Sequence, residues 1–187
     1  EAHVSAKANP FCDQQALAAM RLIGPNLETV YSEPQNRTAR EAVMLGATLA
    51  GIAFSGASVA LVHGMSRPIG AHFHVPHGLS NAMLLAAVTE FSLAAAPERY
   101  AACARAIGFA DAGDDVGAAH ARLMAGLNRI VAALEVPTLS GFGIDRARYF
   151  GMIPVMVEQA LASGSPGNNP RVPTPVELAG LYEAVWG

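Results

Sequence analysis

The sequence is poor in cysteine, aromatic residues and charge. Its two cysteines, Cys12 and Cys103, lie far apart and form no C-x-x-C pattern, so a disulfide framework is not expected and a reducing, cytoplasmic location is favoured. Charged residues make up 14% of the chain and the net charge is −3. The sequence has no basic patch or polybasic run, which argues against binding to nucleic acid or to an anionic membrane.

Long apolar runs and targeting signals are also missing. No uninterrupted apolar run reaches about 18 residues, so no membrane span is predicted. The apolar stretch at residues 43–62 is broken by glycine, serine and threonine. There is no signal peptide and no initiator methionine, and the chain opens at Glu1. We therefore expect that an upstream part has been removed.

Small apolar residues are abundant. Hydrophobic residues make up 52% of the chain, which is too apolar for a disordered protein. Alanine is prominent among them, and it favours closely packed helices over strands. The chain shows no alternating strand pattern, internal repeat or low-complexity tract. The sequence predicts a single all-α domain over residues 1–187.

Local signals predict where the helices lie. Asn9-Pro10 is typical of a helix start, and Pro25 should kink the first helix. Thr174 with Glu177 is a capping signal for the last helix. Residues 68–76, rich in Pro, Gly and His, are predicted to form an irregular connection. The predicted helices span residues 11–31, 37–54, 57–65, 77–93, 97–107, 115–134, 146–161 and 174–185.

Four of the six histidines fall within fifteen residues: His63, His72, His74 and His77. Imidazole is a common neutral ligand for zinc, iron and copper. His63 and His77, on different helices joined by a tight connection, can converge on one ion. The alternative is that these histidines make ordinary polar contacts around a buried loop. No H-E-x-x-H pattern decides between the two.

Three motifs around these histidines carry a family resemblance. They are the segment of residues 51–65 ending in Leu-Val-His63-Gly-Met, the Pro68-Ile-Gly-Ala segment, and Val-Pro-His77-Gly-Leu-Ser-Asn81. Together they resemble the group III, iron-containing alcohol dehydrogenases, and residues 136–144 and 169–174 extend the likeness over essentially the whole chain. The resemblance implies a helical bundle like the C-terminal metal-binding domain of that dehydroquinate synthase-like fold.

The resemblance also implies a site. His63 and His77 correspond to two of four protein ligands of Fe²⁺ or Zn²⁺, and Phe54 to a residue of the substrate pocket. In the family the metal holds the alcohol oxygen, and the alkoxide gives a hydride to NAD(P)⁺. The other two ligands, an Asp and a His one helical turn apart, lie upstream of the position of Glu1. The N-terminal nucleotide-binding half is absent as well. The isolated chain is therefore expected to be inactive, with His3 considered as a substitute ligand.

Arg67 departs from the family pattern, because many members have a histidine there. Arginine cannot relay a proton at neutral pH, but it can pair with a substrate carboxylate or a cofactor phosphate. The alternative is a structural arginine that pairs with a nearby acid or a helix C-terminus. His72 and His74, at alternate positions of an extended stretch, should share a face and could line the cleft between the halves. They could equally be solvated loop residues.

Two functions from different classes follow. The first is the metal-binding half of an oxidoreductase acting on a small alcohol or aldehyde. The second is a free-standing helical module that acts in oligomer or partner assembly. A lyase related to the dehydroquinate synthases is a weaker third. Loss of the other half should expose an apolar wall near Phe54, Met65 and Phe73, so a homo-oligomer is expected.

Overall fold

The computed structural model describes residues 1–187 and contains helices but no β-strand, which confirms the all-α prediction. Nine α-helices and two short 3-10 helices follow one another along the chain. Their bounds are α1 Pro10–Ile23, α2 Leu27–Ser32, α3 Arg37–Ala57, α4 Leu61–Phe73, α5 His77–Ser92, η1 Leu93–Ala95, α6 Pro97–Ile107, α7 Val116–Ala133, α8 Arg146–Ala162, η2 Ser165–Asn168 and α9 Pro175–Ala184.

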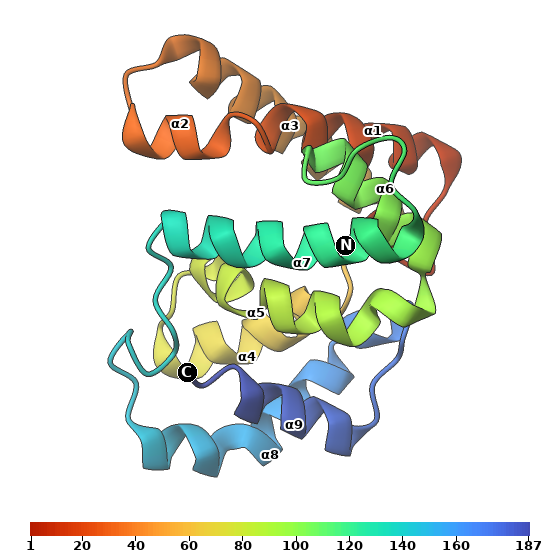
Figure 1. Ribbon diagram of the computed structural model, residues 1–187. Helices are drawn as coiled ribbons and strands as arrows, with labels where there is room; N and C mark the ends of the chain where they lie inside the picture. The colour runs from red at the N-terminus through yellow and green to blue at the C-terminus, as the bar shows by residue number, and fades with distance from the viewer.

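The helices form three tiers (Figure 1). At one end α1 packs along α3, with α2 beside them and α6 against α1. The middle tier holds α7, α5 and α4, and the far end holds α8 and α9. Helix α4 contacts α5, α8 and η2, and α5 also contacts α7 and α9. The two helices that carry His63 and His77 therefore lie at the centre of the molecule.

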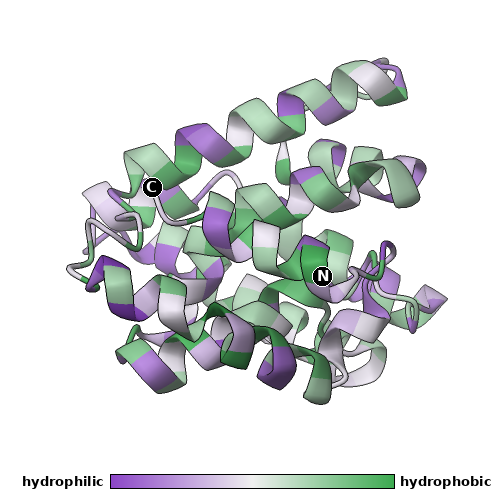
Figure 2. Cartoon of the chain, turned by 90° about the horizontal axis from the view of Figure 1, so that it is seen from below, coloured by the Kyte–Doolittle hydropathy of each residue, from purple (hydrophilic) through white to green (hydrophobic).

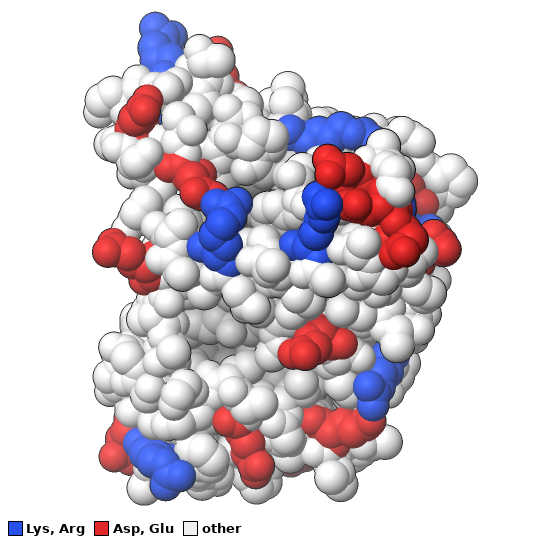
Figure 3. All heavy atoms as spheres, in the orientation of Figure 1, with Lys and Arg blue, Asp and Glu red and all other residues white.

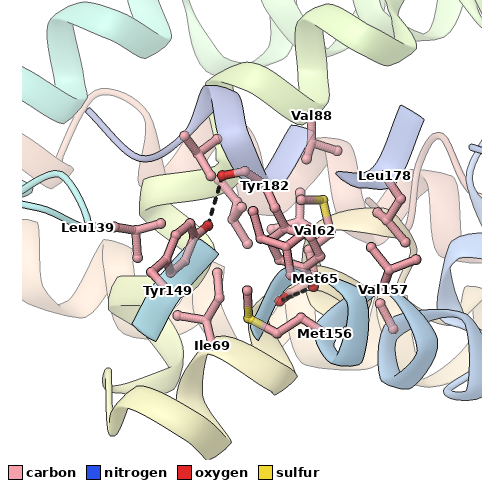
Figure 4. Packing of buried hydrophobic residues seen from close by; sticks show 14 of the residues in the cluster. Val62, Met65, Ile69, Val88, Leu139, Tyr149, Met156, Val157, Leu178 and Tyr182 are labelled. Carbon is pink, nitrogen blue, oxygen red and sulfur yellow. Dashed lines mark hydrogen bonds between the residues drawn. The ribbon is translucent and has the colours of Figure 1, made fainter. Parts of the chain in front are cut away.

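The main core lies between α4, α5, α8 and α9 (Figure 4). Two buried tyrosines connect these helices through hydrogen bonds to backbone carbonyls. The Tyr149 hydroxyl donates to the carbonyl of Tyr182 at 2.8 Å, and the Tyr182 hydroxyl donates to that of Met65 at 3.0 Å. Since α4 takes part through Met65, the backbone that carries His63 is anchored to α9.

A separate core of small side chains joins α1 to α3. It contains Ala2, Cys12, Ala16, Ala53 and Ala57. Close approach of these helices depends on Gly46, because a Cβ there would lie 2.6 Å from Cγ1 of Ile23. This is the tight, alanine-rich helix packing that the composition predicts.

The prediction of one kinked helix over residues 11–31 is wrong. The structure has two helices, α1 and α2, separated at Gly24-Pro25-Asn26. Proline has no backbone N–H and its ring clashes with the carbonyl four residues earlier, and here this ends the helix. The predicted start is confirmed, since the Asn9 side chain accepts from the backbone N–H of Cys12 at 3.1 Å.

The prediction of an irregular connection over residues 68–76 is also wrong. Helix α4 continues through Pro68 to Phe73, and only residues 74–76 separate it from α5. An interior proline costs about 3 kcal/mol. Burial of a large apolar side chain contributes about 1.5–3 kcal/mol, and Met65, Ile69 and Phe73 are all buried at four-residue steps. Together these side chains outweigh the effect of the proline.

The predicted apolar wall is mostly interior. Met65 and Phe73 belong to the main core, and only Phe54 is exposed, at 46% of its surface. The other exposed apolar side chains of α3 are Met44, Leu45 and Ile52. Figure 2 shows apolar residues on every helix rather than in a single segment. Helix α3 thus carries four of the exposed large apolar side chains, whereas α4, the helix that carries His63, carries none.

Charges are sparse and mixed in sign. The face drawn in Figure 3 is largely uncharged, and its acidic and basic side chains lie next to one another. Arg122, for example, pairs with Asp111 at 2.8 Å and with Asp114 at 3.2 Å. No concentration of basic side chains appears on this face.

One helical stretch, His77–Ala95, has the length and hydropathy of a membrane span, with 28% of it buried. The stretch contains Asn81 and Glu90, so it is not the uninterrupted apolar run that sequence analysis sought. It contains all of α5, which contacts helices of the middle and lower tiers. Helices α3 and α4 would count as a second span only if this pair, which is bent by 104°, were taken as one. The core helix of a helical bundle meets the same criterion, so one or two such stretches are weak evidence for a membrane.

Candidate metal centre

His63 and His77, near the starts of α4 and α5, lie side by side. His63 is in the first turn of α4, and His77 is the first residue of α5. Their ring centroids are 5.1 Å apart and their ring planes are tilted by 59°. His74, the residue that caps the end of α4, has a left-handed φ of 57°. The chain therefore turns sharply there and brings the start of α5 back beside α4. Two imidazole rings from different helices are thus adjacent.

Asn81 shows where the two rings point. It lies one helical turn after His77, on the same face of α5. Its amide nitrogen is 3.3 Å from Nε2 of His63 and 3.3 Å from Nε2 of His77. When this amide donates to both atoms, each Nε2 presents a lone pair. Both lone pairs then face a common region, as two ligands of one ion require.

Glu1 fixes the other side of the His63 ring. Its carboxylate contacts Nδ1 of His63 and also accepts the backbone N–H of Val62 at 2.6 Å. Burial raises the pKa of the Glu1 carboxyl, but the hydrogen bond from His63 and the other lowering effects, including the backbone N–H of Val62, outweigh burial, and the pKa is lowered. The ionised carboxylate keeps the proton on Nδ1, which leaves Nε2 free to bind a metal.

The same carboxylate completes the start of α4. The N-cap residue, Ala60, offers no side-chain acceptor, so the first backbone N–H groups of the helix need a partner from elsewhere. The Glu1 carboxylate, 61 residues earlier in the chain than Val62, accepts hydrogen bonds from the backbone N–H groups of Val62 and His63. Glu1 and Asn81 were not predicted as site residues. The only sequence signal for either is the four-residue spacing of His77 and Asn81.

The donor set fits part of a metal site. Two imidazole nitrogens converge, and the Asn81 side-chain oxygen is buried without a hydrogen-bond partner. Nitrogen and oxygen donors suit Fe²⁺ and Zn²⁺. No group of three or more His, Cys, Asp or Glu side chains is placed to hold an ion. The chain therefore brings two imidazoles together, whereas a closed tetrahedral site needs four ligands.

His3 does not complete the pair. Its Nδ1 lies 3.0 Å from a carboxylate oxygen of Asp13, which also pairs with Arg99. Burial lowers the pKa of His3 and the Arg99 charge lowers it further, against the opposing effect of Asp13. His3 thus belongs to a separate polar cluster on the wall of the neighbouring cavity.

An apolar cavity of about 530 Å³ opens beside the histidines. Its lining comes from α1, α3, α4, α5, α6 and α7 and includes Phe54, His63 and Asn81. Glu1 and His3 also border it. Phe54, predicted from the resemblance to line a substrate pocket, therefore shares a cavity with one candidate ligand.

The remaining predicted site residues do not line this cavity. Arg67 is exposed one turn after His63, and its Nη1 donates to Oγ of Ser165 at 2.9 Å. His72 lies 2.8 Å from the side-chain oxygen of Gln159 on α8, and His74 is exposed at the end of α4. The expectation that His72 and His74 share a face of an extended strand is wrong, because α4 remains helical to Phe73.

Comparison with known proteins gives one consistent result. The profile of the Fe-containing alcohol dehydrogenase family, C-terminal, matches residues 1–186. The chain is 34% identical to 1,3-propanediol dehydrogenase of Klebsiella pneumoniae, over all of this chain and 47% of that protein. It is 36% identical to the bifunctional aldehyde-alcohol dehydrogenase of Escherichia coli K12, over 95% of this chain and 22% of that protein.

A solved structure shows the same arrangement. The crystal structure of a 1,3-propanediol oxidoreductase superposes with a TM-score of 0.92 at 33% identity, over 99% of this chain and 48% of that one. The chain thus spans about half the length of the 1,3-propanediol enzymes that it matches, or less in the bifunctional protein. By sequence and by fold, this chain belongs to the iron-containing alcohol dehydrogenase family and forms its C-terminal helical domain.

Proposed function

We propose that this chain is the metal-binding C-terminal half of an NAD(P)-dependent alcohol dehydrogenase. In this proposal His63 and His77 are two of the protein ligands of Fe²⁺ or Zn²⁺. The observation that carries it is the convergence of their Nε2 atoms, each 3.3 Å from the Asn81 amide nitrogen. The relatives' names, which are those of alcohol dehydrogenases, support the reaction class.

Each residue around the pair has a defined task. Glu1 holds the Nδ1 proton of His63, so that Nε2 is available as a ligand. A metal held by His63 and His77 would supply Lewis-acid chemistry that lowers the pKa of the substrate hydroxyl. Phe54 and the apolar cavity keep water away from the side on which an alcohol would lie.

The chain needs a second half to be active. Two imidazoles hold an ion weakly, and nothing in this all-helical chain provides the glycine-rich phosphate-binding turn of a dinucleotide fold. We propose that the remaining ligands and the dinucleotide site come from the N-terminal half that the longer relatives contain. A cytoplasmic location accords with the two free cysteines.

The test compares the 187-residue chain with the protein expressed from its complete coding sequence. Only the complete protein should bind about one metal ion per chain and reduce NAD(P)⁺ in the presence of an alcohol. His63→Ala and His77→Ala should each remove the metal, as measured by elemental analysis. His120→Ala is the control, because that ring contacts the Pro97 carbonyl at 2.8 Å, remote from the site.

Two results would overturn the proposal. One is a complete protein that retains its metal in both His63→Ala and His77→Ala. The other is a metal-loaded complete protein that shows no alcohol-dependent reduction of either dinucleotide.

A specific observation supports the assembly function as well. Helix α3 exposes Met44 at 68%, Leu45 at 53% and Ile52 at 44% of their surfaces. Apolar side chains gathered on one helix promote association. We therefore propose that this surface takes part in a homo-oligomer. Met44→Glu with Ile52→Glu should shift the complete protein to a smaller species in sedimentation, and an unchanged species would contradict this.

A further inference from the structure

Arg67 carries a positive charge that the protein does not neutralise. It is the only Lys or Arg on α4, and that helix contains no Asp or Glu. No carboxylate of the chain lies within 4.0 Å of its guanidinium. Its only hydrogen bond within the protein goes to the Ser165 hydroxyl. A guanidinium has five N–H donors, so most of this group remains available to a ligand.

The packing of η2 on α4 holds Arg67 in place. At Gly64 a Cβ would lie 2.8 Å from the Pro166 ring, so only glycine admits η2 this closely. The close approach brings Ser165, which is 95% buried, within hydrogen-bond reach of Arg67. One end of the guanidinium is thereby anchored while the side chain stays exposed.

Several other arginines of the chain have a carboxylate or an aromatic ring as a partner. Arg99 pairs with Asp13, and Arg171 pairs with Glu177 at 2.6 Å. Arg148, which also has no acidic partner, stacks over the Phe73 ring and donates to the carbonyl of His72. Arg67 has neither a carboxylate nor an aromatic ring beside it. The alternative that Arg67 pairs with a nearby acid does not hold.

Arg67 and His63 occupy the same face of α4. Residues four apart on a helix lie one above the other, separated by about 6 Å along the axis. Both side chains reach the surface, since that of His63 is 25% exposed and Arg67 is exposed. A ligand held at His63 would therefore have the guanidinium within reach along a short carbon chain.

We propose that Arg67 binds the carboxylate of the substrate, and that the substrate is a short-chain hydroxy acid or its oxo-acid product. This inference rests on the proposed function. The hydroxyl lies toward His63 and His77 and the carboxylate lies on the guanidinium, which matches carboxylate geometry through paired N–H donors. Oxidation moves a hydride from carbon to NAD(P)⁺ and releases the hydroxyl proton to solvent, and the carboxylate is unchanged.

The test uses the metal-loaded protein expressed from its complete coding sequence. Two substrates that differ in one end group, 3-hydroxypropionate and 1,3-propanediol, are compared by kcat/KM. The wild type should favour the acid, and Arg67→Gln should reduce the ratio of acid to diol about 10- to 100-fold, as expected for loss of a charge-assisted pair. Arg67→Lys should retain part of the preference. Arg37→Gln on the exposed start of α3 is the charge-matched control.

A second readout does not depend on turnover. Calorimetric titration with propionate should show binding to the wild type that weakens about tenfold or more in Arg67→Gln and is unchanged in Arg37→Gln. An unchanged substrate ratio in Arg67→Gln overturns the inference. So does a change confined to the KM of the dinucleotide, which would assign Arg67 to a cofactor phosphate. If the metal-loaded protein oxidises no alcohol at all, the proposed function fails, and the propionate titration still decides the role of Arg67.

Discussion

The Asn81 amide nitrogen lies 3.3 Å from Nε2 of His77, one helical turn away on α5. Asn81 therefore sits where a further ligand would stand. Asn81→Asp should place a carboxylate beside the two imidazoles and tighten Zn²⁺ binding by about tenfold or more, because a third ligand, the only anionic one, joins the two neutral imidazoles. Competition with a chromogenic chelator measures this. Asn128→Asp on α7 makes the same charge change elsewhere, and an equal gain there would refute the placement.

Glu1 should matter to the metal although it is not a ligand. Glu1→Gln removes the carboxylate that holds the Nδ1 proton of His63. Partners of this kind typically contribute 10- to 100-fold in metal affinity, so a loss of about that size is expected in the complete protein. Glu33→Gln, at an exposed carboxylate that accepts from Asn36, is the control. Equal affinities in the two variants would show that Glu1 does not orient the ring.

The buried tyrosine pair should stabilise the domain. Tyr149→Phe leaves the Tyr182 carbonyl without its donor and should lower the free energy of unfolding by about 1–2 kcal/mol. Urea unfolding measures this. Tyr31→Phe removes an exposed hydroxyl that donates to Glu135, and the loss there should stay within about 0.5 kcal/mol. Equal losses in the two variants would mean that burial does not determine how much these hydrogen bonds contribute to the free energy of unfolding.

Two helical glycines should respond to alanine with opposite signs. At Gly126 on α7 a Cβ would lie 2.3 Å from Cδ2 of Phe109, so Gly126→Ala should destabilise the fold by about 1–3 kcal/mol. At Gly151 on α8 nothing lies within 4 Å, and Gly151→Ala should stabilise it by about 0.5–1 kcal/mol. Thermal unfolding of the two variants is a direct comparison, and a shared sign would contradict the packing described.

The last helix should respond to acid. Bonds from the Thr174 backbone and hydroxyl and from Arg171 lower the pKa of Glu177 below its ordinary value of 4.5. A lowered pKa in the folded state gives stability that is present above 4.5 and is lost as the pH falls through the folded value. Glu177→Gln should therefore flatten the fall in Tm in this acidic window. Glu183→Gln on the same helix should leave the profile as in the wild type.

Features set by nearby residues were predictable from the sequence. The Asn9-Pro10 start and the reciprocal bonds of Thr174 and Glu177 need only three or four neighbouring residues. Pro25 was recognised as a disturbance, but its effect was underestimated. At Pro68 the local signal pointed the wrong way, because burial of Ile69 and Phe73 against distant helices outweighed it.

In the candidate site too, features set by nearby residues were predictable and contacts between distant residues were not. The histidine cluster stands out because its members are close in sequence. Glu1 could not be found in this way, because its partner His63 lies 62 residues further on. The bond between Arg67 and Ser165 spans 98 residues. Such relationships depend on how the tiers stack, which no local pattern encodes.

The bond between Glu1 and His63 also has a kinetic consequence. Its ends are joined only after the intervening loop has closed, and closure becomes less favourable as a loop grows longer. The carboxylate can hold the Nδ1 proton only after that closure, so we expect the metal-binding tautomer of His63 to be fixed only when Glu1 has reached the start of α4. In an unfolded or partly folded chain, protons compete with the metal ion for the histidine nitrogens, so tight metal binding is expected to require the folded helical scaffold.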